Sequence, residues 1–175
     1  MPINLDKHFA GKMYIMLESQ LIWYKHFHLF CDEIIANQEK PPLWIIDLSV
    51  TRFKESTVQI VNQYLYSEPF VELNREELCN QYIACLLLRY ARREISWATF
   101  LFASGQYADG TQGVKEPCEY FFDLLNQYED SDYDKALESS QQSVLQAAFK
   151  DEIAIIAPLY EMFRRYYQQY VQQHA

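Results

Sequence analysis

The sequence predicts an all-α protein, built as a single-domain bundle of six or seven helices. The chain has only 4 Gly among its 175 residues, and such scarcity favours helices over a turn-rich β fold. Apolar residues recur at helical spacing over long stretches. Hydrophobic residues make up 50% of the chain, which is ample for a core. A length of this order fits one helical domain over residues 1–175.

The first predicted helix is long and covers about residues 12–36. Apolar side chains surround it almost completely, which indicates a buried central helix. Asn37 and the pair Pro41–Pro42 end it. Residues 43–48 fit either a short strand or a helical turn that the two prolines begin. We favour the helical turn, because no other segment offers a strand partner.

Four further helices follow in the middle of the chain. Their approximate ranges are 52–66, 74–93, 96–108 and 117–128. Asn74 and Glu77 form a variant of the capping box at the start of the second of these helices. Ser96 is the cap of the third, and Pro117 occupies a first-turn position in the fourth.

The last long segment, about residues 133–172, is predicted to be helical throughout, with Asp132 or Asp134 as its cap. Pro158 should kink or break it, because a proline ring removes one hydrogen bond and crowds the preceding turn. Aromatic residues recur at helical spacing after this proline; they are Tyr160, Phe163, Tyr167 and Tyr170. Their simplest interpretation is a stripe that docks the helix onto the rest of the protein.

The charge of the chain narrows the classes of partner. The net charge is −9 and the sequence pI is about 4.9. Proteins bind nucleic acids and anionic membrane surfaces through their own Lys and Arg side chains. Because this chain is acidic, we expect neither as a partner. No run approaches the ~18 apolar residues of a membrane helix, and residues 1–12 lack the apolar core of a signal peptide. The four Cys include no C-x-x-C pair, which favours buried reduced thiols and a cytoplasmic location.

Metal chemistry has two candidates, and each fails a test of spacing. His28 and Asp32 are i,i+4 neighbours on a predicted helix, but a metal site needs three or four converging ligands. The run from Asp130 to Asp134 opens like an EF-hand loop. Lys135 then stands where that loop needs Gly, and Gln141 stands where it needs Glu.

Catalytic patterns are also lacking. The sequence has no G-x-S-x-G nucleophile elbow and no glycine-rich loop that would cradle a phosphate. We therefore expect a protein that is not an enzyme, with no catalytic residue, no cofactor and no bound metal.

An acidic stretch carries most of the net charge. Residues 109–138 hold nine acidic residues against Lys115 and Lys135, a net charge of −7. Such a stretch can be a solvated face that keeps the protein soluble, or a docking surface that steers a basic partner. Tyrosines near it could act as aromatic anchors. The candidate contact residues are Asp123, Tyr128, Glu129, Asp130, Asp132, Tyr133 and Asp134.

Two segments carry a family resemblance. Residues 92–109 contain an Ile95-Ser96-Trp97 helix start, and residues 116–126 form an aromatic, acidic helix. Together they resemble the small acidic helical immunity proteins of bacterial polymorphic toxins, including those of contact-dependent growth inhibition. The resemblance implies a cytoplasmic protein that binds and neutralises one cognate toxin, often a nuclease, without catalytic residues.

The leading hypothesis is therefore an immunity protein, or antitoxin, that binds a basic toxin domain through its acidic stretch. The alternative is a regulatory or scaffolding helical domain, which would bind a host protein or a second copy through the C-terminal aromatic stripe. A third hypothesis is a helical metalloenzyme that uses His28 and Asp32.

Overall fold

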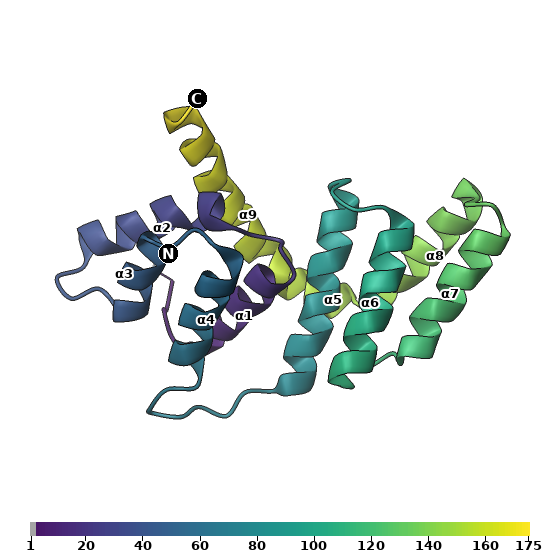
Figure 1. The fold of residues 1–175 in the computed structure, drawn as a ribbon, viewed down its shortest axis with the longest axis horizontal. Coiled ribbons are helices and arrows are strands. Elements are labelled where there is room, and N and C mark those ends of the chain that lie inside the picture. The colour runs from purple at the N-terminus through teal and green to yellow at the C-terminus, as the bar shows by residue number, and fades with distance from the viewer. Residues whose placement is uncertain (1–2) are drawn as a thin grey trace. The chain divides into compact units, whose positions relative to one another are not determined.

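The computed structural model describes residues 3–175 of the chain. These residues form nine helices and no strand, which confirms the all-α class (Figure 1). The helices are α1 (Lys7–Glu18), α2 (Tyr24–Asn37), α3 (Leu43–Ser49), α4 (Lys54–Leu65), α5 (Arg75–Ala91), α6 (Trp97–Thr111), α7 (Cys118–Asp130), α8 (Lys135–Ala148) and α9 (Lys150–Gln173). The predicted count of six or seven helices was too low.

The chain packs as two compact units. Unit 1 comprises the chain up to Leu73 together with Ala157–Ala175, and unit 2 comprises Asn74–Ile156. Helix α9 begins in unit 2 and continues into unit 1. Whether the chain folds as the single domain predicted from its length stays a prediction.

The predicted first helix, residues 12–36, is in fact two helices, α1 and α2. Gln20 between them adopts a left-handed backbone with φ of 63°. The backbone N–H groups of Leu21 and Ile22 both donate to the carbonyl of Met16 and so close the turn. Both side chains are buried, and the apolar pattern therefore continues through the turn. Periodicity alone could not reveal this break.

In unit 1, α1 packs on α4 and α2 packs on α3. Residues 43–49 form helix α3, which confirms the helical turn that the sequence favoured over a strand. The Trp44 ring of α3 stacks on Tyr64 of α4, with ring centroids 4.8 Å apart. Ile45 and Leu48 of α3 are completely buried. This short helix is therefore part of the core.

The C-terminal part of α9 docks on α2 within unit 1 through aromatic residues. Phe163 packs edge-on against Phe30 with ring centroids 5.1 Å apart, and Tyr167 stacks on His26 at 4.6 Å. Tyr160, Phe163 and Tyr170 are buried. Most of the α9 stripe is thus covered by the protein's own helices, and Tyr167 is half-buried.

In unit 2, α5, α6, α7 and α8 pack in chain order, each against the next (Figure 1). Gly105 allows α6 and α7 to approach closely, because a Cβ atom there would lie 2.5 Å from the ring of Phe122. The core contains two stacked rings, Trp97 and Phe100, with centroids 4.7 Å apart. The remaining core is aliphatic and aromatic, with Leu145 and Phe149 fully buried.

A buried polar link ties three helices of unit 2 together. The indole N–H of Trp97 in α6 donates to Gln141 Oε1 in α8 over 2.9 Å. Gln141 Nε2 in turn donates to the carbonyl of Leu124 in α7 over 3.0 Å. Since both buried side chains have partners, the link fixes the helix register without leaving these polar atoms unpaired.

The predicted last helix does not break at Pro158. The break lies instead at Phe149, between α8 and α9, and α9 runs on through Pro158 to Gln173. Ile156 before the proline is buried in unit 2, and Tyr160 after it is buried in unit 1. Packing on both sides therefore outweighs the single hydrogen bond that the ring removes. Phe149 ends α8 with its side chain completely buried.

Candidate functional site

The predicted contact residues lie in unit 2, on α7, in the turn that follows it and at the start of α8. The structure brings most of them to the surface at one end of the α7–α8 hairpin. The exposed members are Glu129, Asp130, Asp132, Tyr133 and Asp134, and Asp123 is exposed two turns earlier on α7. Tyr128 is the exception, since it is buried.

The α7–α8 turn has a defined backbone. Asp132 and Tyr133 both adopt left-handed conformations, with φ of 58° and 60°. The Ser131 hydroxyl accepts a hydrogen bond from the Asp134 N–H over 3.1 Å. Asp134 Oδ2 accepts from the Leu137 N–H over 2.9 Å and so caps α8. One of the predicted contact carboxylates is therefore already used inside the protein.

The buried side chain of Tyr128 supports this turn. Its hydroxyl donates to Glu138 Oε2 over 3.3 Å, and its ring meets the exposed Tyr133 ring edge-on at 5.3 Å. Tyr90 of α5 donates to the other oxygen of Glu138 over 2.8 Å. Burial, together with this bond to Glu138, raises the pKa of Tyr90 to about 12. Of the two predicted aromatic anchors, only Tyr133 is exposed to a partner.

The acidic charge of this region is not neutralised within the described part of the chain. Lys115 pairs with Glu152 at 3.0 Å, and Arg164 pairs with Glu161 at 2.9 Å. Lys115 also donates to the Ala148 carbonyl. One of the two bases of the acidic stretch therefore has its partners, Glu152 and Ala148, outside that stretch. The side chains of Asp123, Glu129, Asp130 and Asp132 form no ion pair or side-chain hydrogen bond among these residues. Their combined field acts on the solvent side.

The sequence prediction missed the other end of α7. Glu119 is exposed one turn before Asp123, and the N–H at the start of α7 lowers the pKa of its carboxyl. Glu119, Glu116 and Asp109 line a pocket of about 350 Å³. Phe102 of α6, 49% exposed, lies beside Phe122 of α7. In the sequence, the i,i+4 spacing of Glu119 and Asp123 could have indicated that the two carboxylates share one face of this helix.

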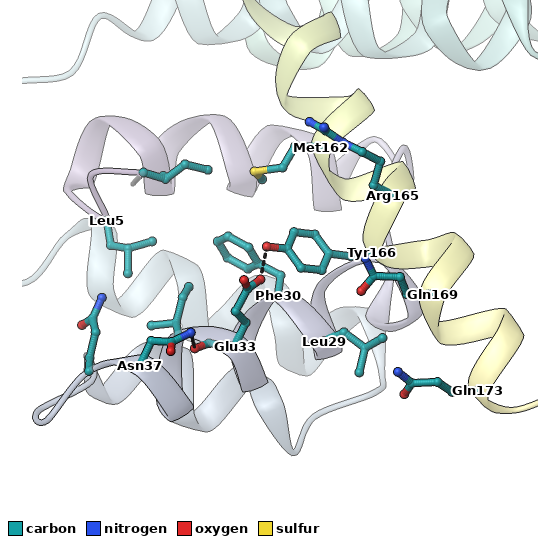
Figure 2. A pocket seen from close by; sticks show the side chains of 13 residues that line it. Leu5, Leu29, Phe30, Glu33, Asn37, Met162, Arg165, Tyr166, Gln169 and Gln173 are labelled. Carbon is teal, nitrogen blue, oxygen red and sulfur yellow. Dashed lines mark hydrogen bonds between the residues drawn. The ribbon is translucent and has the colours of Figure 1, made fainter. Parts of the chain in front are cut away.

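Unit 1 holds a pocket of about 800 Å³ between α2, the C-terminal part of α9 and the segment before α1. Figure 2 shows the Tyr166 hydroxyl turned toward the Glu33 carboxylate, to which it donates a hydrogen bond. Burial and this carboxylate raise the pKa of Tyr166 to about 12. The phenol therefore stays protonated at neutral pH and is no base. Arg165 and Glu33 both line this pocket.

His28, the histidine considered for metal binding, has a structural role. His28 is buried, and its Nε2 lies 2.8 Å from the Thr51 carbonyl, while Asp32 is exposed. No group of three or more His, Cys, Asp or Glu among residues 3–175 could hold a metal ion. Among the described residues, no Cys forms a disulfide; Cys31, Cys79 and Cys85 are buried, as predicted, and Cys118 is partly exposed.

Among residues 3–175, none of the helices has both the length and the hydropathy of a membrane-spanning segment. No family model matches the chain, and no curated protein and no solved structure is similar to it at a significant level.

Proposed function

We propose that the protein is an immunity protein, which binds a basic bacterial toxin domain through the acidic surface of unit 2. The observation that supports this most is the set of carboxylates on α7 and in the α7–α8 turn that have no partner inside the described chain. The acidic surface is defined here as Asp123, Glu129, Asp130 and Asp132, with Tyr133 beside them.

Unpaired surface carboxylates raise the association rate of a cationic partner, because their field acts beyond contact distance. A nuclease toxin must hold phosphates, so its substrate groove is lined by Lys and Arg. An acidic surface can occupy such a groove by charge complementarity. Neutralisation of this kind requires no catalytic residue, metal or cofactor, and it places the protein with its toxin in the cytoplasm.

The surface is also suited to binding because its support is ordered. The cap at Asp134 and the bonds of Tyr90 and Tyr128 to Glu138 hold the turn. A surface that is fixed before binding loses less conformational entropy when the complex forms. Tyr133, 54% exposed, adds an aromatic side chain of the kind found at the centre of interfaces.

The test compares two variants of equal charge. The unit 2 variant carries Asp123→Asn, Asp130→Asn and Asp132→Asn; asparagine suits the left-handed backbone of residue 132. Asp134 is left intact because it caps α8. The unit 1 variant carries Asp32→Asn, Glu39→Gln and Asp47→Asn, which are exposed positions of unit 1. Each variant removes three negative charges.

Wild type and both variants are used as baits in the native host, and a captured basic protein is then expressed alone in a test cell. We expect it to be toxic, to be neutralised by wild type and by the unit 1 variant, and to escape the unit 2 variant. A captured protein without toxicity would contradict the immunity function. A toxin neutralised equally by all three would contradict the acidic surface as the contact.

A further inference from the structure

A small cavity of about 220 Å³ in unit 1 differs in chemistry from the rest of the molecule. It lies where the turn between α1 and α2 meets the start of α4. Its lining residues are Leu17, Gln20, Ile22, Trp23, Tyr24, Arg52, Lys54 and Thr57. The proposed function does not use this cavity.

The walls are apolar and aromatic. Leu17 and Ile22 are buried and form apolar wall. Trp23 is 49% exposed, and its ring packs against His26 and Tyr167. The guanidinium of Arg52 lies 5.5 Å from the ring centroid of Tyr24, a cation–π contact that holds the charge at the cavity.

The charge of the cavity is opposite to that of the protein. The chain has a net charge of −9, yet the lining includes Arg52 and Lys54 and no acidic residue. Neither cation forms an ion pair or a side-chain hydrogen bond within residues 3–175. In the larger pocket of unit 1, by contrast, Arg165 is accompanied by Glu33. Arg52 is exposed and Lys54 is half-buried, and two such cations without a protein anion beside apolar walls fit an anionic ligand.

We propose that this cavity binds a small aromatic carboxylate, a single ring that bears one carboxylate group. Arg52 and Lys54 would hold the carboxylate, and Trp23 and Tyr24 would contact the ring. The volume lies below the roughly 300–1,000 Å³ of sites for drug-sized ligands, which suits a one-ring ligand better than a nucleotide. The apolar walls distinguish the ligand from a bare inorganic anion, which gains nothing from them.

The probe is phenylacetate, titrated into the full chain and followed by calorimetry and by tryptophan fluorescence. Trp23 is the exposed tryptophan, while Trp44 and Trp97 are buried, so occupancy should change the emission of Trp23. We expect saturable binding with a 1:1 ratio. The uncharged isostere phenylacetamide and inorganic phosphate should each bind at least about tenfold more weakly, because each lacks one of the two recognised groups.

Two substitutions and a matched control complete the test. Arg52→Gln and Lys54→Gln should each weaken phenylacetate binding about tenfold, whereas Arg165→Gln, which removes a cation from the other pocket of unit 1, should leave it unchanged. Trp23→Phe should keep the calorimetric binding and lose the fluorescence change. Circular dichroism checks that each variant is folded.

Three results would overturn the proposal. They are the absence of saturable phenylacetate binding, equal binding of phenylacetamide or phosphate, and equal effects of Arg52→Gln and Arg165→Gln. None of them bears on toxin binding, because the cavity lies outside the acidic surface of unit 2.

Discussion

The two units differ in charge more than in construction. Unit 1 holds ten acidic residues against eight Lys and Arg, a net charge of −2, and unit 2 holds fourteen against seven, a net charge of −7. All four His lie in unit 1, where His26 and His28 pack among aromatic rings. The chain thus separates an acidic surface from an aromatic core rich in ring contacts. Surface charge does not determine the fold, but it does indicate the charge of a partner that would bind.

Both units nevertheless contain the same kind of contact. A tyrosine hydroxyl donates to a glutamate on another helix, from Tyr166 to Glu33 in unit 1 and from both Tyr90 and Tyr128 to Glu138 in unit 2. The carboxylate of Glu138 is thereby tied to the core, while Asp123, Asp130 and Asp132 are not. This contrast separates acids that hold the fold from acids that are available for binding.

The largest effects should come from the two cores. Phe163→Ala in unit 1 and Phe100→Ala in unit 2 each remove a completely buried ring, and each should lower the free energy of unfolding by about 3–5 kcal/mol. We expect amide hydrogen exchange to rise mainly in the unit that carries the substitution. A uniform rise over both units would show instead that the chain unfolds as the single domain predicted from its length.

The next effect concerns helix approach in unit 2. Gly105→Ala places a methyl group against the Phe122 ring, and overpacking of this kind costs about 1–3 kcal/mol. Better helix propensity offsets up to about 1 kcal/mol of this. Gly110→Ala is the control, because a Cβ there meets no atom within 4 Å. Urea unfolding should show a loss for the first and a gain for the second; equal effects would refute the close contact.

A smaller effect compares one helix cap from each unit. Asp6 caps α1 by accepting from Phe9 N–H, and Asp134 caps α8 by accepting from Leu137 N–H. Either residue changed to Ala should cost about 1 kcal/mol. At low salt, Asp134→Ala should lose less stability than Asp6→Ala, because removing Asp134 also relieves repulsion among the acidic residues of unit 2. A gap between the two that does not close with added salt would contradict this electrostatic explanation.

The smallest effect lies at alkaline pH. The pKa of Tyr90 is raised from 10.0 to about 12 in the folded protein, so the folded state holds the phenolic proton more tightly than the unfolded state. This stabilisation is complete below pH 10 and is lost as the pH rises toward 12. Tyr90→Phe should therefore make the alkaline loss of stability less steep in urea titrations. Tyr166→Phe should likewise make the alkaline loss of stability in unit 1 less steep. If neither substitution changes the dependence of stability on pH, the hydrogen bonds from these tyrosines to Glu138 and Glu33 are contradicted.

Much of the fold could be predicted from the sequence, because helix signals are local. The caps at Asn74, Ser96 and Asp134 are all present, and residues 43–49 are helical. The breaks at Gln20 and Phe149 were missed because buried apolar residues at the turns, Leu21 and Ile22 in the first and Phe149 in the second, fit the helical pattern. The continuity through Pro158 depends on packing that only the tertiary structure provides.

The site could be predicted only in part. Net charge along the chain located the acid-rich hairpin. Asp130 is exposed at the end of α7, and Asp132 is exposed in the turn that follows. The sequence could not indicate that Tyr128 is buried or that Asp134 is used as a cap, because both depend on contacts across helices and turns. The cavity beside Arg52 joins residues from separate turns, which no motif records.

The most direct test of the acidic surface is the association rate of the purified toxin partner, measured at low and high salt. The unit 2 variant and the unit 1 variant have the same net charge, so only the position of the lost carboxylates differs. We predict that the unit 2 variant associates on the order of tenfold more slowly than wild type at low salt, with a difference that shrinks as salt rises. The unit 1 variant should match wild type. Equal rates for the two variants would show that binding does not use the acidic surface.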